Sequence, residues 1–174
     1  MKTVLILRHA KSSWNDPLLS DHDRPLNKRG KRDAPYIGEF LKRRQLVPDL
    51  ILSSTAKRAR KTAQAVAKAS GYDGKVEMIT SFYHSEPKTY ISQLADLPDI
   101  YQRVMVVGHN PTLEMLVTQL TNCFETMPTA AVAYVQLPIE NWRKLADSIT
   151  AGSIQGQLVQ LWRPKELVLD QSAS

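Results

Sequence analysis

The residues with the clearest chemical potential are Arg8 and His9, which directly follow the apolar run Val4–Leu7. Such a run is typical of a buried strand, and the two side chains at its end would lie at the edge of a sheet. A guanidinium group presents a planar fork of donors that suits phosphate oxygens, and a neutral imidazole is a competent nucleophile toward phosphorus. The pair therefore indicates phosphate chemistry if other segments bring matching groups to it, and otherwise an ordinary polar strand end.

Two further segments place polar groups after apolar runs. Ser54 follows one such run, with Arg58 in the first turn of a predicted helix, although Ser54 could simply cap that helix. In the Gly108–Pro111 segment, glycine permits a tight exit from a strand, Asn110 can cap a helix, and proline suits the first helical position. His109 would then lie beside a helix N-terminus, which attracts anions; a plain turn with an exposed histidine is the alternative.

The elements that must position these residues alternate along the chain. Short apolar runs are followed by longer segments with helical periodicity, which predicts βαβ units. The expected strands are Thr3–Leu7, Leu50–Ser53, Val76–Thr80, Arg103–Val107, Ala131–Leu137 and Gly156–Trp162. The expected helices are Asn27–Arg44, Ala56–Ser70, Pro87–Leu97 and Thr112–Leu120.

This order predicts an α/β protein: a three-layer α/β/α sandwich with a mostly parallel sheet, in which one late strand runs antiparallel. Such folds bind ligands outside the carboxyl ends of their strands. Arg8, His9, Arg58 and His109 should therefore converge at one edge of the sheet.

The length and composition of the chain indicate how many domains it forms and in which environment it folds. A chain of 174 residues is near the common size of one domain, so we expect residues 1–174 to form a single catalytic or binding domain. The only cysteine, Cys123, cannot form an internal disulfide or a cysteine-rich zinc site, which suits a reducing cytoplasm. Thr3–Leu7 is too short an uncharged run for a signal peptide or a membrane span, so no membrane association is expected.

The net charge of +6 is unevenly distributed. Residues 1–70 carry 16 Lys/Arg against 6 Asp/Glu, whereas residues 71–174 carry 7 against 11. A basic half favours anionic partners in general, whether phosphate, phosphoprotein or nucleic acid. No nucleic-acid motif is visible, and the aromatic residues do not alternate with basic ones in a stacking pattern, so nucleic acid is not the expected partner.

Together the motifs resemble the histidine phosphatase superfamily, which has the phosphoglycerate mutase-like fold. Residues 8–10 match its Arg-His-Gly signature with Ala10 in the third place, and Asn15 stands where that signature carries a phosphate-binding asparagine. Residues 53–63 are similar to the segment of the second arginine, Arg58, and residues 108–111 to that of the second histidine, His109. Within the superfamily, residues 11–14 and 20–30 resemble the small SixA-type phosphohistidine phosphatases.

The resemblance implies a covalent mechanism without metal or cofactor. His9 would attack the phosphoryl group in line, and water would then hydrolyse the phosphohistidine formed on the enzyme. Arg8, Arg58 and His109 would bind the phosphoryl oxygens and stabilise developing charge. Because His9 must be neutral at the attacking nitrogen, we expect an acceptor to hold its other ring nitrogen.

The general acid is where the chain departs from the larger members of the superfamily, whose pattern places a glutamate after the third strand. Here Glu86 and His84 are both candidates, and Asp21 or Asp23 could approach from the first loop. A helix-start carboxylate and a surface imidazole are the plainer interpretations of Glu86 and His84. Imidazole leaves phosphorus with less help than an alkoxide does, so a site without a dedicated acid should prefer phosphoramidates or activated aryl esters.

The function expected from the sequence is therefore a metal-independent phosphatase for phosphohistidine in a phosphorylated protein, such as a phosphorelay domain. A phosphatase for small phosphomonoesters would use the same pocket, with Glu86 or an aspartate as acid. A phosphate, phosphoprotein or nucleic-acid binding module without turnover is the alternative of a different class. The sequence does not determine the oligomeric state or the role of residues 138–155, where a short helix at Asn141–Ala146 is one interpretation.

Overall fold

The computed structural model describes residues 1–167 and has a single sheet at its centre. The strand order is β3-β2-β4-β1-β5-β6. The strands are β1 (Lys2–Arg8), β2 (Leu50–Ser54), β3 (Glu77–Ile79), β4 (Arg103–Gly108), β5 (Val132–Leu137) and β6 (Gln157–Trp162). β1 pairs in parallel with β4, which pairs in parallel with β2, and β2 with β3. β5 runs antiparallel to both β1 and β6, as the predicted late antiparallel strand.

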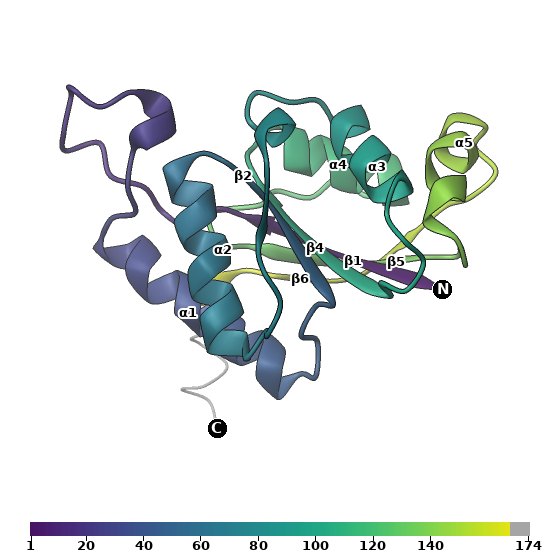
Figure 1. Cartoon of the computed structure of the whole chain (residues 1–174), viewed down its shortest axis with the longest axis horizontal. Coiled ribbons are helices and arrows are strands. Elements are labelled where there is room, and N and C mark those ends of the chain that lie inside the picture. Colours follow the sequence, from purple (N-terminus) through teal and green to yellow (C-terminus); the bar gives the residue numbers. More distant parts are fainter. Residues whose placement is uncertain (168–174) are drawn as a thin grey trace.

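Two layers of helices cover the sheet (Figure 1). The helices are α1 (Lys28–Arg43), α2 (Lys57–Ser70), α3 (Pro87–Ala95), α4 (Thr112–Thr121) and α5 (Leu145–Thr150). Alternate residues of each strand face opposite layers: Leu5 and Leu7 pack toward α1 and α2, whereas Val4 and Ile6 pack toward α3 and α4. The central strands are buried on both faces, which is why they read as continuous apolar runs in the sequence.

Outside residues 138–155, the boundaries of the strands and helices differ from the sequence prediction by at most two residues. The predicted strand Val76–Thr80 shortens to β3, because Thr80–Phe82 forms the 3₁₀ turn η2. The segment 138–155 holds the 3₁₀ turn η3 (Trp142–Lys144) followed by α5, so the helical part extends further than the predicted Asn141–Ala146. Trp142 anchors it, because its indole N–H donates to the carbonyl of Tyr101 at 2.8 Å in the core. Within residues 1–167, no helix is long and apolar enough to span a bilayer.

Candidate active site

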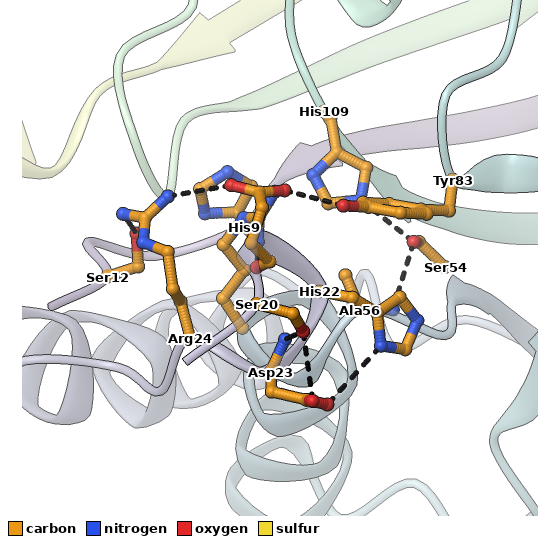
Figure 2. A network of polar contacts seen from close by, with 12 residues as sticks. His9, Ser12, Ser20, His22, Asp23, Arg24, Ser54, Ala56, Tyr83 and His109 are labelled. Atoms are coloured by element: carbon orange, nitrogen blue, oxygen red, sulfur yellow. Dashed lines mark hydrogen bonds and ion pairs between the residues drawn. The ribbon is translucent and has the colours of Figure 1, made fainter. Parts of the chain in front are cut away.

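The two predicted histidines meet because β1 and β4 are adjacent strands. Arg8 pairs with Gly108 in the parallel register, and the N–H of His9 donates to the carbonyl of Gly108 at 3.1 Å. The rings of His9 and His109 lie side by side with their centroids 5.2 Å apart (Figure 2). Gly108 is needed for a reason other than the predicted tight exit: a Cβ at this position would collide with the hydroxyl of Tyr90.

His9 is almost completely buried, and its ring orientation is fixed. Its Nδ1 lies 2.8 Å from the carbonyl oxygen of Ala10. Because a carbonyl only accepts, Nδ1 must carry the proton, which leaves a lone pair on Nε2. This is the acceptor that a nucleophilic His9 was expected to require. Burial is the main cause that lowers the pKa of His9 to about 4, so the ring is neutral at physiological pH.

The ring of His109 is held by Ser54. The Nε2 atom lies 2.8 Å from Ser54 Oγ, and the edge of the ring that carries Nδ1 is turned toward His9 (Figure 2). Among the described residues, Nδ1 is buried and has no hydrogen-bond partner. Burial, followed by the neighbouring His9, lowers the pKa of His109 to about 3. His109 is thus neutral in the free protein.

Ser54 does not cap α2. The N-cap residue is Ala56, and no side chain caps the helix. Ser54 Oγ instead accepts a 3.3 Å hydrogen bond from the N–H of Ala56, in addition to its contact with His109. The Ser54 hydroxyl therefore orients the His109 ring and does not act as a helix cap.

Arg58 enters the site from the first turn of α2, as predicted. Its guanidinium is buried and donates to Asp21 twice, to the backbone carbonyl at 2.6 Å and to the carboxylate at 3.0 Å. Thr62, one turn along α2, accepts from the N–H of Ala10 at 2.9 Å and donates to the carbonyl of Arg58 at 2.7 Å. The Thr62 hydroxyl thus joins the His9 turn to the helix that carries Arg58.

Arg8 is the last residue of β1, directly before His9. Its Nη1 donates to the carbonyl of Met127 at 3.0 Å, and its buried Nε has no partner among residues 1–167. Burial lowers the pKa of Arg8, although the charge of Glu114 counteracts this. The charge of Arg8, together with those of Arg58 and Arg24, lowers the pKa of His9 further.

Arg24 is a site residue that the sequence interpretation missed. It is buried, donates to Ser12 Oγ at 2.6 Å and to Asp21 at 3.1 Å, and stacks on the indole of Trp14 at 3.2 Å from the ring centroid. Its segment, residues 20–30, resembles the SixA-type phosphatases as a whole. An arginine between two aspartates and a proline is an ordinary loop sequence, so the only available signal was the motif itself.

Tyr83 is a second missed residue, and it lies after the third strand. Its hydroxyl donates to the carboxylate of Asp21 at 2.6 Å, and its ring meets that of His109 edge-on. Beside it is a cavity of about 330 Å³. The cavity is lined mainly by residues 82–87 on one side and residues 109–112 on the other, with Arg58 and Met115 completing the wall.

None of the three candidate carboxylates is suited to donate a proton. Glu86 is exposed at the cavity rim, and its ion pair with Lys88 lowers its pKa. Asp23 is exposed and turned toward Ser20, whose hydrogen bond lowers its pKa (Figure 2). The hydrogen bond from Tyr83, with those from Arg58 and Arg24, holds the pKa of Asp21 well below its usual range.

His84 remains at the rim of the cavity, exposed and packed against the ring of Tyr83, with a left-handed backbone at φ 53°. Asn15 is not brought to the site. It lies in the exposed part of the first loop, and the hydrogen bond that it makes uses its backbone N–H, which donates to Ser13 Oγ.

Asn110 does not cap α4 as predicted. The N-cap position is occupied by Pro111. The Asn110 amide donates instead to Glu114 and to the carbonyl of Met127, each at 2.9 Å. Because the same carbonyl accepts from Arg8, Asn110 helps to fix the loop that orients Arg8.

The sheet order and the layers define a phosphoglycerate mutase-like α/β fold, with arginines and histidines gathered at the carboxyl edge of the sheet. A model of the histidine phosphatase superfamily (branch 1) matches residues 4–81. An uncharacterized chloroplastic protein of Arabidopsis thaliana is 34% identical over 153 residues, which cover 82% of this chain and 70% of that protein.

Two solved structures share the fold over nearly the whole chain. A protein of Agrobacterium tumefaciens assigned as the phosphohistidine phosphatase SixA is 31% identical, with a TM-score of 0.76 and coverage of 94% of this chain and 98% of that one. The protein histidine phosphatase SixA in complex with tungstate is 21% identical, with a TM-score of 0.80 and coverage of 95% and 99%. The chain belongs to the histidine phosphatase superfamily and is SixA-like, which makes it a phosphatase.

Proposed function

We propose that the protein hydrolyses phosphohistidine in a phosphorylated protein through a covalent intermediate on His9. The observation that carries the proposal is the state of His9: a buried neutral imidazole whose Nδ1–H is held by the Ala10 carbonyl, so that the Nε2 lone pair is the nucleophile. Arg8, Arg24 and Arg58 supply the positive charge that a phosphoryl group requires.

In the first step, His9 Nε2 attacks phosphorus, and the bond from phosphorus to the leaving nitrogen breaks. Solvent protonates the other ring nitrogen of the substrate imidazole, which then leaves as a neutral ring that keeps the electron pair of the broken bond. In the second step, water attacks the phosphohistidine on His9, inorganic phosphate leaves, and neutral His9 is restored. The guanidinium groups bind the phosphoryl oxygens and stabilise the charge that develops on them.

Ser54 and His109 form a positioning pair in this mechanism. Because Ser54 Oγ already accepts from the N–H of Ala56, its own proton is available for Nε2 of His109. His109 then carries its proton on Nδ1, on the ring edge turned toward His9 (Figure 2). A neutral His109 donates from Nδ1 to a phosphoryl oxygen, and a bound dianion would raise its pKa.

The expected leaving group is an imidazole and not an alkoxide, because the carboxylates near the site are unable to donate a proton. Glu86, Asp23 and Asp21 all have lowered pKa values, so each is ionised at neutral pH and does not provide the proton that an alkoxide needs. An imidazole ring, with an unperturbed pKa of about 6.5, takes a proton from solvent on its free ring nitrogen and leaves as a neutral molecule, so it needs no carboxylic acid at the site. The cavity of about 330 Å³ beside His109 is open to a side chain that carries the phosphoryl group.

The deciding experiment compares kcat/KM for a phosphohistidine peptide, a phosphoserine peptide and a sugar phosphate. We expect the phosphohistidine peptide to be the preferred substrate, and a clear preference for the sugar phosphate would select the small phosphomonoesterase instead. Acid-quenched labelling should locate the phosphoryl group on His9. Binding without any release of phosphate would identify the non-catalytic alternative. A cytoplasmic location stays a prediction from the sequence.

A further inference from the structure

Asp21 accepts hydrogen bonds from three side chains that could also bind a phosphate group: Arg24, Arg58 and Tyr83. It lies in the 3₁₀ turn η1 (Asp21–Asp23) of the loop between β1 and α1. One carboxylate oxygen accepts from Arg58 at 3.0 Å and from Tyr83 at 2.6 Å, and the other accepts from Arg24 at 3.1 Å. The second arm of the Arg58 fork is also taken, because it donates to the backbone carbonyl of Asp21 at 2.6 Å.

A carboxylate bound by two guanidinium groups and a phenol is the arrangement that also suits phosphate oxygens. One N–H group on each Nη atom of Arg58 is bound to Asp21, and these two N–H groups are not free for a phosphoryl group. A phosphoryl group that takes the same two donors must therefore break these contacts. The lowered pKa of Asp21 means that the competing group stays negatively charged throughout the physiological range.

We propose that Asp21 is an internal anion that competes for the phosphate site and thereby sets its selectivity against small free anions. This inference rests on the proposed phosphate site. A phosphorylated substrate can offset the cost of displacing Asp21 through contacts of its leaving group in the cavity next to His109. Inorganic phosphate has no leaving group, so the same cost weakens its binding, and the enzyme avoids occupation by its own product.

The test measures the affinity for inorganic phosphate by titration calorimetry at pH 7.5, for the unmodified protein and for Asp21→Asn. Removing one charge while keeping the shape should tighten phosphate binding on the order of tenfold or more, because charge-assisted hydrogen bonds to the competitor are weakened. Asp21→Ala should tighten it as well. The matched control is Asp23→Asn, since Asp23 is exposed and contacts Ser20 and His22 instead of the arginines.

Other outcomes overturn the inference. Weaker phosphate binding by Asp21→Asn would show that Asp21 positions Arg58 and Arg24, and an unchanged affinity would show that it does not compete. Melting temperatures of both variants establish that the fold is retained. The experiment measures equilibrium binding of phosphate, so its result does not depend on the proposed function. If Asp21→Asn binds phosphate more tightly but the unmodified protein hydrolyses no phosphohistidine peptide, the role of Asp21 as a competing anion stands and the proposed substrate is wrong. Hydrolysis of the phosphohistidine peptide together with an unchanged affinity for inorganic phosphate would support the proposed substrate and reject the competing anion.

Discussion

The N–H of His9 donates a hydrogen bond to the carbonyl of Gly108, the residue directly before His109. This single backbone contact extends the parallel pairing of β1 and β4 by one step beyond the ends of the strands. It places two histidines that are 100 positions apart in the chain with their ring centroids 5.2 Å from one another. Register between two strands, and not any local motif, therefore fixes the distance on which the proposed chemistry depends.

Replacing the proposed nucleophile should abolish turnover. We expect His9→Ala to reduce phosphatase activity to background while the protein remains folded, because no other imidazole within residues 1–167 has the same geometry toward the three arginines. Activity is measured as phosphate release, and folding by circular dichroism. His22→Ala is the control, since this imidazole bonds to Thr55. Undiminished turnover by His9→Ala would remove the covalent mechanism.

Arg58→Ala should lower kcat/KM on the order of 10²-fold or more, in analogy with the loss of one donor to a developing negative charge. The matched control is Arg60→Ala, two residues along the same helix, where the side chain is exposed. Steady-state kinetics with an aryl phosphate distinguish the two variants. If Arg58→Ala changes neither KM nor kcat, Arg58 takes no part in phosphate binding.

The two site histidines should stay neutral until the pH is well below 6. Burial lowers the pKa of His9 to about 4 and that of His109 to about 3, whereas an unfolded histidine titrates near 6.5. Proton NMR of the imidazole resonances should show no titration of either ring between pH 6 and 8. An inflection near 6.5 for His9 would contradict the proposed ground state.

The same shifts predict how stability depends on pH. Between pH 6.5 and about 4, the unfolded chain binds protons at His9 and His109 that the folded chain does not bind. The free energy of unfolding should therefore fall as the pH is lowered through this range. Denaturant unfolding of His9→Ala should show a shallower decline than the unmodified protein, and an equal or steeper decline would argue against a buried neutral His9.

Ser54→Ala should lower kcat/KM about tenfold, because His109 loses the hydroxyl that fixes its tautomer. The ¹⁵N chemical shifts of the His109 ring should show a mixture of tautomers in the variant. A purely structural role of Ser54 would leave these shifts unchanged. Ser53→Ala is the control: Ser53 is equally buried, but its hydroxyl donates to the carbonyl of Ser54 and not to His109. Unchanged kinetics would leave Ser54 without a positioning role.

The order of strands and helices, and the edge of the sheet at which chemistry would occur, follow from the amino-acid pattern alone. Buried strands must be apolar on both faces, and the residues that end them are set by that pattern. The pattern therefore suffices to assign Arg8, His9, Arg58 and His109 to one edge of the sheet. Local pattern was less reliable for capping, since the polar atoms of Ser54 and Asn110 bind groups outside the helices that follow them.

What occupies the site depends on the folded arrangement of the loops. Arg24, Tyr83 and Asp21 lie in loop segments, and no periodicity constrains where a loop side chain points. The structure joins Arg24, Tyr83 and Arg58 through the one carboxylate of Asp21, and it places Asn15 and Asp23 outside this cluster. The protonation states of His9 and His109 could be inferred only from the folded structure. The pKa of a histidine depends on its burial and on charges that lie distant in sequence.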